Sequence, residues 1–504
     1  MAPLMTTKKF WCQPSSTPHL KKIMFAMRGE TLFGRKSMQS VDPEQHPTYK
    51  LIGMPEVDNN PLLAHLNLPP GTDDEAFIAL GLRPDFQVED RLLPSIFRRI
   101  RINRLRNFFV PAQPVHREAL IGIASQVFHG YIQRNPLTPE GQRRLLGAPK
   151  EQSYKPTISF IAGHSGMGKS TLVDRILASL GQQVYHHTEF NKQPFPECQI
   201  LWLRRNVPEH CTVKTLCSSF GDYTDRVLGN TLYERLFTSA RRDHRDQLIT
   251  EIRKIITNHH VGLLVFDEFQ NLSLMGVGAE KIIALLVNLR DELGIPILVV
   301  GTYSALHLLE RNLSTARRLA EGGYYDLQRP TSVANEDWQQ LCRIVWPYQW
   351  VQNPLDYSEK ICDALYEVSQ GITGIMLSVF ASAQIVAINN GSEQVDANLI
   401  LNVFNERMKP LHPAIRALKA GNVLELTKFE GLYKSFYPDK ELPETASPHL
   451  IESPPAIINP PSSNTKKSKR KSSVSRTKVL TPEQIKSRVL DDCASDIVSV
   501  LKSK

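Results

Sequence analysis

Thr157-Ile-Ser-Phe-Ile-Ala-Gly-His-Ser-Gly-Met-Gly-Lys-Ser-Thr171 is the stretch that decides the fold of this 504-residue chain. Its apolar beginning predicts a buried strand, which runs directly into Gly163-x-x-x-x-Gly168-Lys-Ser, the phosphate-binding loop pattern. The helical spacing of the apolar residues that follow predicts a helix whose N-terminal end faces the loop. This strand–loop–helix context favours a functional loop over a chance match in a glycine-rich turn.

The composition of the loop explains what it can bind. Glycines let backbone N–H groups wrap a polyphosphate, Lys169 reaches the β- and γ-phosphates, and the Ser170 hydroxyl binds Mg²⁺. ATP and Mg²⁺ are therefore the expected cofactors. The residues expected to contact the nucleotide are Gly163, His164, Ser165, Gly166, Met167, Gly168, Lys169, Ser170 and Thr171.

Bulk composition bounds the class of protein. The length predicts two to four domains, and the 41% hydrophobic and 22% charged content is typical of a soluble globular protein. We find no apolar run long enough to span a bilayer and no signal peptide, so a cytoplasmic location without a membrane partner is expected. Seven scattered cysteines without a C-x-x-C pair indicate reduced thiols rather than a disulfide or zinc framework.

The formal charge of +9 is unevenly distributed. The stretch Lys466–Lys478 carries seven basic residues and no acid, which leaves about +2 for the rest of the chain. The overall charge is therefore weak evidence that the folded part binds nucleic acid.

Residues 1–110 are expected to form an irregular N-terminal region that binds a partner, because prolines and turns are frequent there; a small domain without clear periodicity is the alternative. Five arginines in Phe97–Arg106 could contact DNA phosphates or an acidic partner, or could instead form a solvated helix face or internal ion pairs. Residues 114–133 have a helical period.

Residues 111–330 alternate strand and helix patterns, which predicts an α/β domain around a five-stranded parallel sheet. Helical material is expected over 212–228, 231–257 and 279–293. The expected strands are Thr157–Ala162, Gln199–Arg204, Val261–Phe266, Ile295–Val300 and one near Tyr324–Leu327.

Residues 331–420 predict a small all-helical domain, a lid on the nucleotide domain, with helices near 335–345, 357–369, 373–389, 395–407 and 411–419. Residues 421–480 are a linker rich in Pro, Ser and Lys. Residues 481–504 have capping signals and a possible apolar stripe, which favours an amphipathic partner-docking helix over one that packs on its own core.

Three residues at strand ends complete the predicted ATPase site. Asp267 ends a buried strand and can hold Mg²⁺, while Glu268 is placed to polarise the water that attacks the γ-phosphate. Thr302 closes the next strand, which this architecture places between the two motif strands. It can sense the γ-phosphate, or it is simply a turn threonine.

Two sets of basic residues are candidates for contacts outside the loop. Arg317 and Arg318 could act on the γ-phosphate of a neighbouring subunit, as arginine fingers do, or could be a plain surface pair. The insert before the Asp-Glu strand could contact DNA phosphates or could be a solvated helix face. Its basic residues are Lys214, Arg235, Arg241, Arg242, Arg245, Arg253 and Lys254.

With these motifs in place, residues 150–420 resemble the TnsC-type (TnsC/TniB) AAA+ ATPases, regulators of transposons that use TnsA and TnsB. The resemblance rests on the phosphate loop and on Leu263–Gln270, Val299–Thr302 and Ala316–Arg318. Two further stretches, Tyr366–Gly371 and Lys409–Leu418, lie outside the general ATPase motifs and narrow the resemblance to this family.

The resemblance implies an AAA+ P-loop NTPase that assembles as a ring or helical oligomer on double-stranded target DNA. It implies that a TnsD/TniQ-type target-selection protein recruits the ATPase, which regulates the transposase proteins TnsA and TnsB at the bacterial nucleoid. It places DNA-backbone contacts, with little sequence preference, at Lys214, Arg241, Arg242 and Arg245.

One departure concerns the second sensor. Many AAA+ proteins have an arginine at the start of a lid helix, but Gly371–Ser378 contains no basic residue, which predicts slow hydrolysis used as a switch. The alternatives to a transposition regulator are a helicase loader or initiator-type ATPase and a scaffold that binds nucleotide without hydrolysing it.

Overall fold

A computed structural model describes residues 46–145, 157–209, 211–239, 245–272, 277–305 and 322–421, with single residues 317, 426 and 429. The chain divides into two compact units, Met1–Pro438 and Asp439–Lys504, and all described residues belong to the first. Nearly all of the expected linker and the whole expected C-terminal helix lie outside the described residues.

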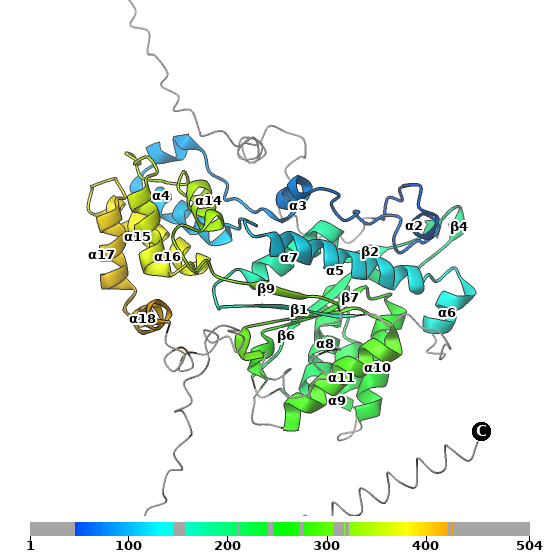
Figure 1. Ribbon diagram of the computed structural model, residues 1–504. Helices are drawn as coiled ribbons and strands as arrows, with labels where there is room; N and C mark the ends of the chain where they lie inside the picture. The colour runs from blue at the N-terminus through cyan, green and yellow to red at the C-terminus, as the bar shows by residue number, and fades with distance from the viewer. Residues whose placement is uncertain are drawn as a thin grey trace, which may run out of the picture. The chain divides into compact units, whose positions relative to one another are not determined.

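A five-stranded parallel sheet forms the centre of the first unit, in the order β6-β7-β8-β1-β9 (Figure 1). This confirms the predicted sheet, including the position of β8 between the two motif strands. The strands are β1 (Ile158–Gly163), β6 (Trp202–Asn206), β7 (Leu263–Asp267), β8 (Ile297–Gly301) and β9 (Tyr324–Leu327).

Both faces of the sheet are covered by helices, which explains the continuous apolar runs of its strands. In β7, Leu263 and Val265 belong to the core beneath α5 and α7, whereas Leu264 and Phe266 belong to the core beneath α8, α10 and α11. These helices are α5 (Pro114–Gln133), α7 (Lys169–Leu180), α8 (Val213–Leu228), α9 (Tyr233–Ser239), α10 (Arg245–Asn258) and α11 (Val277–Leu293).

The second expected strand is divided in two. β5 (Cys198–Ile200) pairs antiparallel with β2 (Val184–His186), and only β6 joins the central sheet beside β7. A small hairpin of β3 (Glu189–Phe190) and β4 (Gln193–Pro194) was not anticipated. Strands of two or three residues are too short to show a period of two, so the sequence pattern could not separate them.

The helical domain after the sheet is confirmed. Its helices are α14 (Glu336–Val345), α15 (Glu359–Ser369), α16 (Thr373–Asn389), α17 (Ala397–Arg407) and α18 (His412–Ala420), with the 3₁₀ turn η4 (Lys409–Leu411). No single helix in the described residues is long and apolar enough to cross a bilayer; α15 and α16 pass that test only as a pair bent by 117°.

Residues 46–110 form short helices joined by loops, and their expected role in binding a partner stays a prediction. They pack along the nucleotide domain and the lid, with Asn60 and Leu63 fully buried, although their burial follows no helical or strand period. The helical elements of residues 46–110 are α2 (Pro55–Asp58), α3 (Asp73–Leu80), η1 (Val88–Leu92), α4 (Ser95–Ile102) and η2 (Asn103–Asn107). Two further short elements are α6 (Pro139–Leu145), after α5, and the 3₁₀ turn η3 (Phe269–Asn271), after β7.

In the arginine-rich stretch Phe97–Arg106, Arg98 and Arg101 form ion pairs within the protein. Arg98 is 2% exposed and donates from both terminal nitrogens to the two Glu393 carboxylate oxygens, at 2.6 and 2.7 Å. Arg101 pairs with Asp90. Because Arg98 points inward, α4 turns Ile96, Phe97 and Ile100 to the surface.

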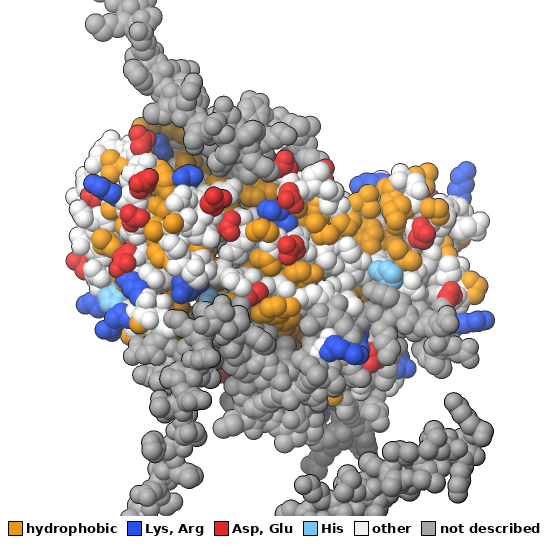
Figure 2. Space-filling model, in the orientation of Figure 1, with side chains coloured by type: hydrophobic (Ala, Val, Ile, Leu, Met, Phe, Trp, Pro, Cys, Tyr) orange, Lys and Arg blue, Asp and Glu red, His pale blue; other side chains and the backbone are white. Residues whose placement is uncertain are grey.

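Surface charge on the visible face follows the same near-neutral pattern as the sequence outside the basic run. Acidic and basic side chains are interspersed there rather than separated by sign (Figure 2). Among the described residues on this face, Figure 2 shows no extended basic surface of the kind that binds nucleic acid.

We predict that Glu393→Gln destabilises the protein by about 3 kcal/mol, because it removes the carboxylate charge from the buried Arg98 guanidinium. Denaturant unfolding followed by circular dichroism measures the change. The matched control is Asp222→Asn, which removes a helix-surface pair whose Arg226 side chain is 69% exposed, and should change stability by less than about 0.5 kcal/mol. If the two variants lost the same stability, the buried ion pair between Arg98 and Glu393 would not stabilise the protein more than a surface pair does.

Candidate functional site

The phosphate loop joins β1 to α7 and is held in an open curve by its glycines. Gly166 and Gly168 have φ of +84° and +82°, in the left-handed region that side chains disfavour. A Cβ on Gly163 would come within 2.8 Å of the Leu327 carbonyl oxygen on β9, so this glycine is required by close packing. The loop residues predicted to bind nucleotide therefore adopt the backbone path that such a loop needs.

Lys169 begins α7 and curls back over the loop. Its Nζ donates to the carbonyl oxygens of Gly163 and His164, at 3.0 and 2.9 Å. Burial lowers the pKa of Lys169 to about 8, against the opposing effect of Glu268 and Asp267. The ammonium group therefore lies inside the loop and loses its proton at a lower pH than an exposed lysine does.

Ser170 and Asp267 come together from different elements. The Ser170 hydroxyl donates to Asp267 Oδ2 at 3.1 Å, and the Glu268 N–H donates to Asp267 Oδ1 at 2.8 Å. Asp267 is 3% exposed. A hydroxyl and a carboxylate at this distance form the hard oxygen donor set that Mg²⁺ prefers, so these two residues fit the implied metal.

Glu268 and Thr302 are connected through Gln270, which ends the Leu263–Gln270 stretch but to which the sequence patterns assigned no role. Gln270 donates to the Glu268 carboxylate and accepts from the Thr302 N–H at 3.0 Å. Glu268 itself has a φ of +55°, a costly conformation for a non-glycine residue. The amide therefore ties the second acid to the end of β8, where Thr302 is 6% exposed.

Arg204 is a second residue that sequence reasoning missed. It lies on β6 and donates to Asp267 Oδ2 and to Asp174 on α7. An arginine in a strand gave no motif signal, because its role depends on the pairing of β6 with β7.

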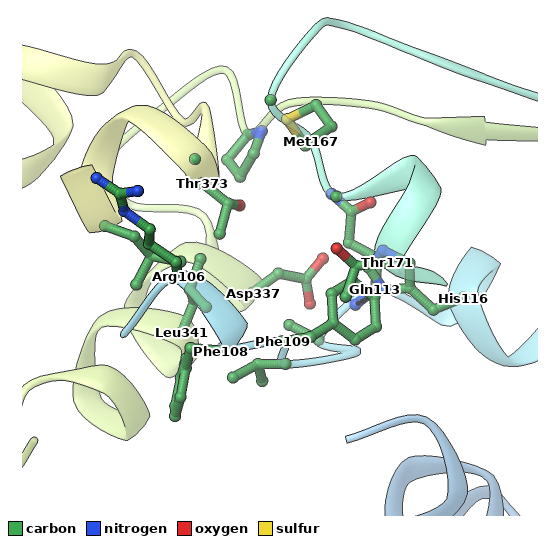
Figure 3. A pocket seen from close by; sticks show the side chains of 17 residues that line it. Arg106, Phe108, Phe109, Gln113, His116, Met167, Thr171, Asp337, Leu341 and Thr373 are labelled. Carbon is green, nitrogen blue, oxygen red and sulfur yellow. Dashed lines mark hydrogen bonds between the residues drawn. The ribbon is translucent and has the colours of Figure 1, made fainter. Parts of the chain in front are cut away.

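A cavity of about 240 Å³ opens beside the loop, between the N-terminal segment, the loop and the lid (Figure 3). The Asp337 side chain points into it from α14, across from Phe109 and Thr171. Apolar and aromatic walls with a few polar groups are typical of a pocket for a small organic ligand. The N-terminal segment contributes Arg106, Phe108, Phe109 and Val110 to it, and the chain that leads into α5 contributes Ala112, Gln113 and His116.

The lid touches the loop through its backbone. The Gly374 N–H in the first turn of α16 donates to the Gly166 carbonyl at 2.8 Å. A side chain on Gly374 would meet that carbonyl at 2.9 Å, so the approach requires glycine. The guanidinium-bearing residue that lines the cavity is Arg106, which comes from η2 rather than from α16.

The structure describes only some of the residues predicted for subunit and DNA contacts. Arg317 is exposed, and Arg318, Arg241 and Arg242 lie outside the described residues. Arg245 begins α10, but its side chain is not among those described, while Lys214 is partly exposed in the first turn of α8. Their roles stay predictions.

Residues 152–309 match the family model described as AAA domain. No curated protein matches the chain. The five-stranded parallel sheet followed by a helical domain is the AAA+ P-loop NTPase fold, and Asp267, Glu268 and Thr302 fall inside the matched region.

Solved structures show weaker likeness. A Walker-type ATPase of Pyrococcus abyssi is 17% identical over 54% of this chain and 71% of its own, with a TM-score of 0.32. Cdc6p of Pyrobaculum aerophilum is 14% identical over 57% of this chain and 66% of its own, with a TM-score of 0.35. The RuvB Holliday junction branch migration motor of Thermotoga maritima is 12% identical over 52% of this chain and 64% of its own, with a TM-score of 0.29. These values are too low to transfer a role to this chain.

We predict that affinity for a fluorescent ATP analogue falls as pH rises above about 8. Phosphate raises the pKa of Lys169 above its free value of about 8, so the charged lysine contributes fully below that pH. Above it, the dissociation constant should increase by up to about tenfold per pH unit. Lys169→Arg stays charged and should give a flatter profile between pH 7 and 9.5; a wild-type profile as flat as that of Lys169→Arg would contradict this role.

Proposed function

We propose that this protein is an ATPase that binds ATP with Mg²⁺ and hydrolyses it slowly. The observation that carries this proposal is the 3.1 Å contact between Ser170 of the loop and Asp267 of β7, with Glu268 next in the chain. The contact joins the phosphate-binding and acidic motifs, 97 residues apart, at one edge of the sheet. The neighbouring cavity suits the nucleotide base.

Each residue of the site has a role in this proposal. Lys169 binds the β- and γ-phosphates, and Ser170 and Asp267 hold Mg²⁺, which neutralises phosphate charge when bound. Glu268 accepts a proton from the attacking water. Thr302, at the end of β8, orients that water or contacts the γ-phosphate, and Arg317 or Arg318 of a neighbouring copy stabilises the developing charge.

The proposed wider role is regulation of DNA transposition. The motifs shared with TnsC-type ATPases support it, including the two stretches outside the general ATPase motifs. In this role the protein assembles on double-stranded DNA through Lys214, Arg241, Arg242 and Arg245. It then connects a TnsD/TniQ-type target-selection protein to TnsA and TnsB, with hydrolysis releasing the assembly.

We predict that Glu268→Gln lowers phosphate release by about 100-fold while nucleotide affinity is retained, because the variant keeps the shape of the base but cannot accept the proton. Lys169→Ala should lose both binding and hydrolysis. Measurements are phosphate release with and without double-stranded DNA, and titration of a fluorescent ATP analogue.

Electron micrographs with DNA and a non-hydrolysable ATP analogue separate the wider roles. Rings or filaments in the wild type that disappear in Lys169→Ala support the proposed assembly, and monomers under all conditions contradict it. Equal phosphate release by wild type and Glu268→Gln would instead favour a scaffold that binds nucleotide without hydrolysis. Loading of a replicative helicase without stimulation of transposition would favour the initiator-type alternative.

A further inference from the structure

Arg204 lies where a cation is expected to bind. Its side chain is 17% exposed and donates to Asp267 Oδ2, the same oxygen that accepts the Ser170 hydroxyl. Asp267 Oδ1 is already bonded to the Glu268 N–H. Both oxygens of the predicted metal-binding carboxylate are therefore engaged by groups of this chain.

The strand pairing explains how Arg204 reaches this point. β6 pairs with β7 in the register Arg204↔Val265 and Asn206↔Asp267, so Arg204 lies two residues short of Asp267 on the neighbouring strand. In parallel strands, residues at this offset share a face of the sheet. Arg205 belongs to the other face, where its guanidinium stacks on Tyr223 of α8 at 5.4 Å.

The guanidinium also has a second anchor. Another of its nitrogens donates to Asp174 on α7, whose side chain is 64% exposed, and the Ser170 carbonyl lies 3.4 Å from the nitrogen that contacts Asp267. Arg204 can therefore release Asp267 and keep an acidic partner at the surface. Its pairing with Asp267 is replaceable, whereas a buried carboxylate without any cation would be costly.

We propose that Arg204 is a tethered cation that competes with Mg²⁺ for Asp267 and so sets the Mg²⁺ concentration at which the nucleotide site is loaded. A divalent cation between Ser170 and Asp267 would share Oδ2 with the Arg204 guanidinium. Two positive charges bound to one carboxylate oxygen lie close together and repel each other strongly. The inference rests on the proposed ATP site and adds to it a competing cation outside the known motifs.

The first test titrates Mg²⁺ at a fixed concentration of a fluorescent ATP analogue. Arg204→Gln should reach half-maximal binding at about tenfold lower Mg²⁺ than the wild type, because the competing charge is gone. Arg204→Lys keeps a charge and should lie close to the wild type. The matched control Arg205→Gln, on the same strand but the opposite face, should leave the titration unchanged.

The second test is independent of hydrolysis and of nucleotide. In EDTA, thermal unfolding of Arg204→Gln should occur at a lower temperature than that of the wild type, because Asp267 loses its ion pair. Mg²⁺ alone should restore stability to the variant at lower concentrations than are needed to stabilise the wild type. If Arg204 instead only holds Asp267 in place for the metal, both tests should show that the variant needs more Mg²⁺.

The outcomes separate the two proposals. Wild-type protein that binds the analogue, with Arg204→Gln requiring the same or more Mg²⁺, overturns the competition. If the wild-type protein binds no analogue, the proposed ATP site is wrong. The unfolding series with Mg²⁺ alone still tests whether Arg204 weakens the binding of a cation at Asp267. A variant that responds to lower Mg²⁺ in both series supports the inference.

Discussion

The backbone hydrogen bond from Gly374 to the Gly166 carbonyl is the contact on which the arrangement of this protein depends. It brings the first turn of a lid helix directly onto the phosphate loop, and a side chain at position 374 would collide with the Gly166 carbonyl oxygen. Gly166 and Gly374 line the cavity beside the loop, together with Phe108 and Phe109 of the N-terminal segment. Loop, lid and N-terminal segment are thus parts of one site.

Asp267 is the electrostatic centre of the same site. Its two oxygens receive a hydroxyl, a backbone N–H and a guanidinium, which come from the loop, from its own strand end and from the neighbouring strand. Next to it, Gln270 connects Glu268 to the end of β8. Acid, base and strand-end residue are therefore linked through hydrogen bonds, so a change at one position alters the partners of the others.

The sequence predicted the parts of the molecule that are periodic or carry a motif. The five parallel strands and the five lid helices were recognisable because long apolar runs and helical spacing can be read from the sequence without knowing the fold. Arg204, Gln270 and the cavity were not, since each depends on pairing between strands or on segments far apart in the chain. The packing of residues 46–110 was missed for the same reason: its buried residues follow no period, and Arg98 meets Glu393 across 295 positions.

The ion pair between Arg98 and Glu393 has a mechanical consequence. It fastens α4 to the loop between α16 and α17 of the lid, while Asn67, in the same N-terminal segment, donates to the last turn of α7 behind the phosphate loop. The segment is therefore a strap with one end on the lid and the other on the nucleotide domain. A change in the angle between the lid and the nucleotide domain would therefore displace α4 and the exposed side chains of Ile96, Phe97 and Ile100.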